Sequence, residues 1–221
     1  MENKHGLPLL NVANSLAGTR MLGPGWRSVV WVQGCGFDCP GCIAPEWHSN
    51  NPARLVTPQE LAAELLADPR VDGLTFSGGE PMLQAAGLAE LARLTRAQRE
   101  LSIICFTGFT LDALQGPDTG GTGWHAAAAA LLAQVDVLID GPYVEELNDN
   151  RGLRGSSNQR VQHLSGRLRD YDFENAPRRA EIRLAEGYAM LVGVPTQHLE
   201  QGFQQALSKA RKLFIGQEKP G

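Results

Sequence analysis

The stretch "SVVWVQGCGFDCPGC", residues 28–42, joins an apolar run to a loop that holds three cysteines. The run is rich in β-branched residues, which predicts a buried strand. The cysteines Cys35, Cys39 and Cys42 follow at the spacing C-x3-C-x2-C. Because the glycines and the proline between them let the backbone turn tightly, three thiols can converge. We therefore expect a ligand-bearing loop at the carboxyl end of a strand.

The composition of the chain restricts what this loop can hold. The 221 residues are 43% hydrophobic and contain no apolar run of 18 residues, and the opening "MENKHGLPLL" lacks a secretory signal pattern. We therefore expect a cytoplasmic enzyme with no membrane segment. In a reducing cytoplasm, four cysteines with three in one loop favour a metal site over disulfides. A net charge of -4 and a pI near 5.7 predict no binding to nucleic acid.

The strand before the cysteine loop is the first of several that alternate with helices. The stretches "GLTFSGGEP" (73–81), "LSIICFTGF" (101–109) and "VDVLIDGPY" (135–143) each combine an apolar run with a glycine turn. Helical patterns precede each of them, and Thr57 with Glu60 forms a capping box at the start of one. This alternation predicts an α/β fold with a mainly parallel sheet, whose glycine-rich loops gather at one edge.

Beyond these units, the sequence predicts an extension of another kind. The stretch "AEIRLAEGYAMLVGVP" (180–195) is typical of a hairpin that turns at Glu186 and Gly187, and a helix with an apolar stripe follows it. The segment "GPDTGGTG" (116–123) is expected to be a flexible excursion. We expect one domain over residues 1–221, with a core at about 25–165 and a C-terminal extension at about 166–221.

Two kinds of metal centre suit the cysteine loop. Three thiolates can hold three corners of a 4Fe-4S cluster, and one iron stays open for a ligand because Cys105 lies within an apolar strand. Alternatively, the three cysteines and His48 complete a tetrahedral zinc site. The turn "SGGEP" at residues 77–81 favours the cluster, since its glycines and carboxylate suit a small molecule with an ammonium group. A structural zinc site has no need of such a turn.

With both motifs in order, the chain resembles the radical S-adenosylmethionine superfamily, whose signature is a C-x3-C-x2-C loop after the first strand and a Gly-Gly-Glu turn after the second. The resemblance implies a partial (β/α) TIM-like barrel. It implies that the three cysteines bind a 4Fe-4S cluster, and that the amino and carboxylate groups of S-adenosylmethionine chelate the fourth iron. The cofactor-binding residues on this interpretation are Gly78, Gly79, Glu80, Pro81, Thr107 and Asp140.

Further matches, namely "TG" at 107–108, "DGP" at 140–142 and "LRGSSNQR" at 153–160, are similar to the small activating enzymes of anaerobic ribonucleotide reductase. This resemblance implies reductive cleavage of S-adenosylmethionine to a 5'-deoxyadenosyl radical, which takes hydrogen from a backbone glycine of a glycyl radical partner enzyme. It also implies a one-electron donor such as flavodoxin or ferredoxin.

Asp140 is the candidate catalytic residue, because it ends a strand beside a glycine, although a turn-capping role fits it equally. Two other functions stay open. One is a radical enzyme that modifies a peptide or a small molecule. The other is a non-catalytic interaction module stabilised by zinc.

Overall fold

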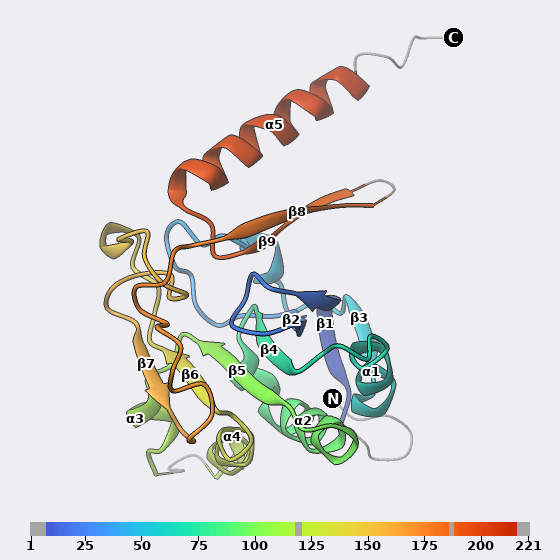
Figure 1. The fold of residues 1–221 in the computed structure, drawn as a ribbon, viewed down its shortest axis with the longest axis vertical. Helices are drawn as coiled ribbons and strands as arrows, with labels where there is room; N and C mark the ends of the chain where they lie inside the picture. The colour runs from blue at the N-terminus through green and yellow to red at the C-terminus, as the bar shows by residue number, and fades with distance from the viewer. Residues whose placement is uncertain (1–7, 118–120, 186–187, 216–221) are drawn as a thin grey trace.

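The computed structural model describes residues 8–117, 121–185 and 188–215 of the chain (Figure 1). Strands alternate with helices through most of this length, as the sequence predicts. The elements, in order, are β1 (Leu10–Thr19), β2 (Arg27–Val32), η1 (Pro45–Trp47), β3 (Arg54–Val56), α1 (Pro58–Leu65), β4 (Gly73–Gly78), η2 (Pro81–Gln84), α2 (Ala85–Gln98), β5 (Ser102–Thr107), α3 (Leu111–Leu114), α4 (Trp124–Leu132), β6 (Val137–Asp140), η3 (Glu145–Leu147), β7 (Arg160–His163), β8 (Ala180–Ala185), β9 (Tyr188–Gly193) and α5 (Gln197–Ile215).

The central sheet has seven strands in the order β3-β1-β2-β4-β5-β6-β7. Strands β2, β4, β5 and β6 are parallel, whereas β1, β3 and β7 pair antiparallel with their neighbours. Among the described strands, β3 and β7 each pair on one side, so the sheet is open. The predicted α/β fold with a mainly parallel core is therefore confirmed, and it has the form of an open sheet.

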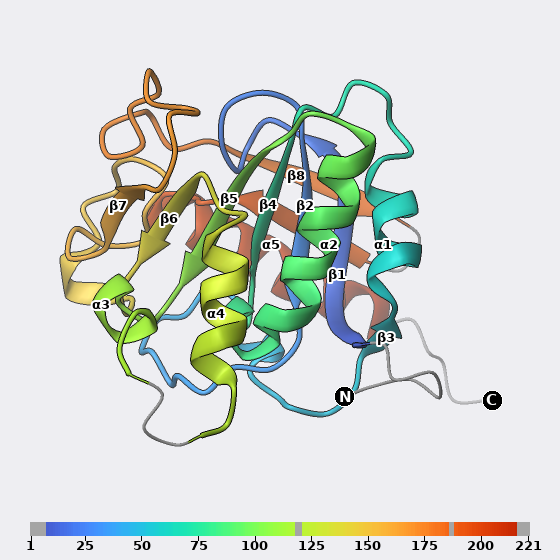
Figure 2. The ribbon, with the colours of Figure 1, turned by 90° about the horizontal axis from the view of Figure 1, so that it is seen from below.

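Helices cover one face of this sheet. Figure 2 shows α1, α2 and α4 side by side across it. The capping box of α1 is confirmed, since the Thr57 side chain accepts from the Glu60 amide while the Glu60 carboxylate accepts from the Thr57 amide. On α2, Leu88, Leu91 and Ala92 are buried on one face of the helix. These helices and the facing strand residues form the largest apolar cluster of the described chain.

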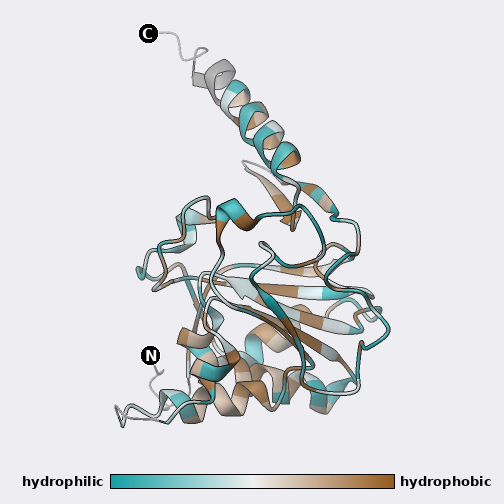
Figure 3. Ribbon diagram, turned by 90° about the vertical axis from the view of Figure 1, so that its left-hand side faces the viewer, coloured by the Kyte–Doolittle hydropathy of each residue, from teal (hydrophilic) through white to brown (hydrophobic). Residues whose placement is uncertain are grey.

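The C-terminal hairpin covers part of the other face. Strands β8 and β9 form a separate two-stranded sheet, and Val192 of β9 packs in a cluster with Leu22, Val29 and Trp31. The predicted hairpin and helix are confirmed, while the predicted turn at 186–187 lies outside the described residues. Figures 1 and 3 show α5 projecting from the body of the molecule, with both apolar and polar residues along it.

The sequence analysis did not predict the antiparallel strands β1, β3 and β7. The register of β1 against β2 shifts twice, between Val12 and Asn14 and between Leu16 and Thr19. Such bulges break the alternation of apolar and polar residues that marks a strand. Strand β3 spans three residues, too few for a periodic signal. The predicted excursion at 116–123 lies partly outside the described residues, and no described helix is long and apolar enough to cross a membrane.

Candidate active site

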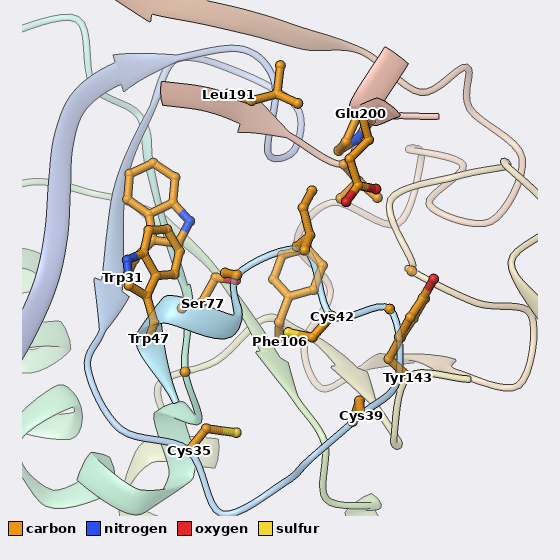
Figure 4. A pocket seen from close by; sticks show the side chains of 18 of the residues that line it. Trp31, Cys35, Cys39, Cys42, Trp47, Ser77, Phe106, Tyr143, Leu191 and Glu200 are labelled. Atoms are coloured by element: carbon orange, nitrogen blue, oxygen red, sulfur yellow. The ribbon is translucent and has the colours of Figure 1, made fainter. Parts of the chain in front are cut away.

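The loops that follow β2, β4 and β5 meet at the carboxyl ends of these parallel strands, where α/β sheets bind their ligands. Between them lies a cavity of about 560 Å³, which is within the usual range for small-molecule sites. Figure 4 shows the side chains around it. The predicted site residues that line the cavity are Cys35, Cys39, Cys42, Gly78, Gly79, Glu80, Pro81 and Thr107.

The cysteine loop is closed at its base and open at its tip. The Gly34 amide donates to the Trp47 carbonyl at 2.9 Å, and the Cys35 amide donates to the His48 carbonyl at 3.2 Å. Within the loop, the Cys42 amide donates to the Cys39 carbonyl at 3.2 Å. The three thiols are free and half-buried. The loop thus presents three cysteine sulfurs without a disulfide to one cavity.

The thiols of the cysteine loop do not form a ready single-ion site in the described part of the chain. Among the described residues, no three histidine, cysteine or acidic side chains lie close enough together to hold one metal ion. In a four-iron cluster each cysteine sulfur binds a different iron, whereas in a zinc site all the cysteine sulfurs bind the same ion. Burial raises the pKa of the Cys35 and Cys42 thiols, so metal loading must release their protons.

His48, the fourth ligand of the zinc interpretation, lies beside this loop. Its Nε2 atom is 3.3 Å from the Cys42 sulfur. An imidazole N–H at that distance donates to a thiolate, and such a hydrogen bond is one of the factors that set the potential of an iron–sulfur cluster. The contact therefore places His48 next to Cys42, a predicted metal ligand.

The Gly-Gly-Glu turn is the most fully bonded part of the site. Glu80 is 1% exposed, and its carboxylate accepts from the Met82 amide, the Thr107 hydroxyl and the Gly108 amide, each at 2.8 Å. These bonds tie the end of β4 to the end of β5. Burial raises the pKa of Glu80 to about 7 despite the three donors.

The carboxylate of Glu80 also lacks a counterion among the described residues. A buried carboxylate without a cation is costly to ionise, so it favours a positively charged ligand. The neighbouring Gly78 and Gly79 pack closely against the backbone of Val32 and Gly34, which holds Glu80 at this position. An ammonium group, such as that of the methionine moiety of S-adenosylmethionine, fits this position.

Backbone contacts join the two loops directly. The Glu80 amide donates to the Gly34 carbonyl at 2.8 Å, and the Gly79 amide donates to the Val32 carbonyl at 2.8 Å. A Cβ atom on Gly79 would lie 2.2 Å from the Gly34 oxygen and 3.0 Å from the Trp47 oxygen. The second glycine is therefore required by the close approach of the two loops.

Asp140, the candidate catalytic residue, lies away from this cavity. It is fully buried, and its carboxylate accepts from the Leu111 amide at 2.6 Å and pairs with Arg160 at 2.8 Å. It is not among the residues that line the cavity, although the following Gly141 is. These contacts show Asp140 capping the start of α3 and joining β6 to β7.

The "LRGSSNQR" segment contributes through its polar and small residues. The Gln159 side chain donates to the Gly141 carbonyl at 2.8 Å and accepts from the Gly155 amide at 2.8 Å. Gln159 and Gly155 line the cavity, whereas Arg160 pairs with Asp140 and Arg154 pairs with Asp149. The segment therefore closes one side of the site, and its arginines are held by internal carboxylates.

Sequence reasoning missed several large side chains of the cavity. Trp31 and Trp47 lie with ring centroids 6.0 Å apart, and Phe106 lies near them (Figure 4). Trp31 and Phe106 directly precede the cysteine loop and the Thr107 turn, so strand alternation places them on the face without helices. Leu191 and Glu200, from the C-terminal extension, also line the cavity. Their sequence context gives no signal, because only the tertiary fold brings the extension to this place.

Comparisons with known proteins agree with this geometry. A family described as a 4Fe-4S single cluster domain matches residues 21–162. The anaerobic ribonucleoside-triphosphate reductase-activating proteins of Salmonella typhimurium and Escherichia coli are 33% and 32% identical to this chain, over 64% of it and 91% of their own length. The pyruvate formate-lyase-activating enzyme of Clostridium pasteurianum is 38% identical over 56% of this chain and 49% of its own. The chain belongs to the radical S-adenosylmethionine family, in the group with a single 4Fe-4S cluster domain.

Membership in this family defines the cofactors. They are a 4Fe-4S cluster and S-adenosylmethionine, and the chain is accordingly a radical S-adenosylmethionine enzyme. The residues of the cavity fit both groups, since they combine three free thiols with a buried carboxylate that lacks a counterion.

Proposed function

We propose that this chain is an activating enzyme that forms a glycyl radical in a partner enzyme of the anaerobic ribonucleotide reductase or formate lyase kind. One observation carries the proposal. The free thiols of the cysteine loop and the buried Glu80 carboxylate line the same cavity, at the strand ends of a chain similar to named activating proteins.

The roles of the site residues follow from their positions. Cys35, Cys39 and Cys42 would hold three irons of the cluster. Glu80, with the Gly78 and Gly79 backbone, would bind the ammonium group of S-adenosylmethionine. When bound, the two groups supply one-electron cleavage of a sulfonium and, from it, abstraction of a hydrogen atom.

The aromatic residues of the cavity would exclude water from the reaction. Trp31 and Phe106 cover the floor of the cavity, and Trp47 stands beside the cysteine loop. A dry site protects a reactive species from side reactions. Thr107 has a positioning role, because its hydroxyl holds Glu80 in place.

The proposal also specifies a cellular location, a hydrogen donor and an electron donor. Three free thiols in one open loop require reducing conditions, which fits the cytoplasm. The hydrogen donor would be a backbone glycine of the partner enzyme. A one-electron donor such as flavodoxin or ferredoxin would reduce the cluster.

The test is anaerobic reconstitution with iron and sulfide, followed by incubation with S-adenosylmethionine, a reductant and the anaerobic ribonucleoside-triphosphate reductase from the same genome. We expect a glycyl radical on the reductase by electron paramagnetic resonance. The Cys42→Ala variant should give no radical, and Cys105→Ala should give one, because Cys105 is buried in the sheet away from the cavity.

Two other results would overturn the proposal in different ways. Cleavage of S-adenosylmethionine that depends on an added peptide or small molecule, with no radical on the reductase, would assign the chemistry to a smaller substrate. A colourless protein with one bound zinc and no affinity for S-adenosylmethionine would assign the loop to a structural metal site.

A further inference from the structure

The C-terminal hairpin has two faces with different surroundings. Antiparallel partners share a face, so Arg183 and Met190 lie on one side. On that side Met190 and Val192 pack toward the central sheet, in the cluster with Trp31. This inner face fixes the hairpin over the open side of the sheet.

The outer face of the hairpin is apolar and largely uncovered. Ile182 pairs with Leu191, and Leu184 pairs with Ala189. Ile182 is 52% exposed and Leu184 is 78% exposed. Two neighbouring aliphatic side chains with this exposure leave an apolar strip that favours contact with another molecule.

Helix α5 presents apolar side chains to the same cavity as the hairpin. Phe203 and Leu207 lie four residues apart, so they share one side of the helix. Both line the active-site cavity together with Ala189 and Leu191 of the outer hairpin face. Ala189 and Leu191 of the outer hairpin face and this side of α5 therefore line one groove, which we call the extension groove. The strip of Ile182 and Leu184 continues the same hairpin face beyond the cavity lining.

The extension groove opens directly into the reaction site. The same cavity that contains Leu191, Phe203 and Leu207 also contains the three cysteines. Figure 4 shows Leu191 and Glu200 on the side of the cavity away from Cys35 and Cys39. A ligand in the groove would therefore extend to the place where the hydrogen atom is removed.

Glu200 lines the cavity on the side of the groove, and the carboxylate of Glu145 lies nearby, against Gly41. Glu200 of α5 is half-buried, and burial together with the nearby charge of Glu145 raises its pKa. Among the described residues, neither carboxylate forms an ion pair. This arrangement favours a basic group in the ligand.

The extension lies beyond the part of this chain that matches the short reductase-activating proteins. The family match ends at residue 162, and less than two thirds of this chain accounts for 91% of the Salmonella typhimurium protein. That protein therefore has little length left for a counterpart of the hairpin and α5. The groove is a feature added to a shared core.

We propose that the extension groove binds the polypeptide segment of the partner enzyme that carries the reacting glycine. The inference rests on the proposed function. The segment is extended and apolar along the hairpin, and it places a basic side chain near Glu200. A small substrate would fit within the cavity and would not need the exposed strip at Ile182 and Leu184, which lies beyond the cavity lining.

The test compares Ile182→Glu and Leu184→Glu with Leu55→Glu. Leu55 is 43% exposed on β3, at an end of the central sheet, and serves as the matched control. Glycyl radical formation is measured against the concentration of the reductase from the same genome, and cleavage of S-adenosylmethionine is measured without the reductase. We expect the two hairpin variants to raise the KM for the reductase about tenfold or more, and Leu55→Glu to leave it unchanged.

Three outcomes would overturn the inference and can be told apart. An equal KM in all variants would remove the groove from docking. A wild-type dimer that Leu184→Glu converts to a monomer would assign the groove to a second copy of this chain. Wild-type protein that cleaves S-adenosylmethionine but forms no radical on the reductase would refute the proposed function, and the groove proposal with it.

Discussion

The Gly-Gly-Glu turn and the cysteine loop face each other across one cavity, and they are stabilised very differently. Glu80 is buried and accepts three hydrogen bonds, so the turn is fixed by the protein alone. The loop at residues 35–46 is held at its base by two backbone bonds, and its thiols remain half-exposed and free. On the proposed assignment, the protein builds the binding site for the small molecule in advance, whereas metal binding completes the cysteine loop.

The largest effect should come from the loop. Cys42→Ala removes one of the three proposed sulfur ligands, and we expect the reconstituted protein to lose most of its bound iron, because two cysteines leave a further iron of the cluster without its thiolate. Cys105→Ala, in the buried sheet, should keep its iron and lose about 1 kcal/mol of unfolding free energy. Iron and sulfide analysis checks both variants, and iron retained in Cys42→Ala would contradict the assigned ligands.

A second variant tests the junction of the two regions. In Gly79→Ala, the new methyl group would meet the backbone oxygen of Gly34 at 2.2 Å. We expect a loss of about 1–3 kcal/mol in the free energy of unfolding, and weaker cluster binding, because the loop must move away from the turn. Gly36→Ala is the control, since a Cβ atom there has no neighbour within 4 Å. Equal denaturant midpoints in both variants would show that the contact is not rigid.

The third change, Glu80→Gln, tests the protonation of the buried carboxylate in the Gly-Gly-Glu turn. The pKa of Glu80 is raised from 4.5 to about 7, so between these pH values the folded protein holds more protons than the unfolded chain. The free energy of unfolding of the cluster-free protein should therefore fall as pH rises from about 4.5 to 7, by about 3 kcal/mol in total. Glu80→Gln should remove this dependence, as measured by urea unfolding across that range.

The same variant should weaken cofactor binding. A neutral amide cannot pair with an ammonium group, and we expect about a 10- to 100-fold loss of affinity for S-adenosylmethionine. Glu90→Gln is a matched control, because Glu90 pairs with Arg93 on the surface of α2. Equal affinity in Glu80→Gln and the wild-type protein would place the ammonium group elsewhere.

The smallest effect should come from His48, which touches the open loop from outside the ligand set. His48→Leu removes the N–H donor beside the Cys42 sulfur, and we expect full iron content with activity reduced about tenfold. The loss of the imidazole N–H should also lower the reduction potential of the cluster. The reduced cluster carries more negative charge, so this hydrogen bond stabilises it more than the oxidised cluster. A redox titration followed by paramagnetic resonance measures it, and loss of iron would instead identify His48 as a ligand.

The difference between the two regions also explains what the sequence could predict. Cys35, Cys39, Cys42 and the Gly-Gly-Glu turn lie in short local patterns directly after strands, so spacing and strand order were enough to bring them together. Asp140 has the same local pattern, yet its carboxylate is turned toward Arg160 and α3. The direction of a side chain at a strand end depends on its partners in space, which local patterns do not contain.

The walls of the cavity were harder to predict for the same reason. Leu191 and Glu200 reach the site because the hairpin packs on Trp31 and its neighbours, across more than 150 residues of sequence. The antiparallel strand β1 escaped prediction because its bulges interrupt the apolar alternation. Helices with capping signals, such as α1, were predicted closely, since their start is defined by contacts within one turn.

The most direct test of the central claim is reductant-dependent cleavage of S-adenosylmethionine to 5'-deoxyadenosine by the anaerobically reconstituted protein. The account predicts cleavage by the wild-type protein and by Cys105→Ala, and none by Cys39→Ala. Cleavage by Cys39→Ala at the wild-type rate, or no cleavage by a wild-type protein that has bound its iron and sulfide, would contradict the claim that the three cysteines and the Gly-Gly-Glu turn form one radical-generating site.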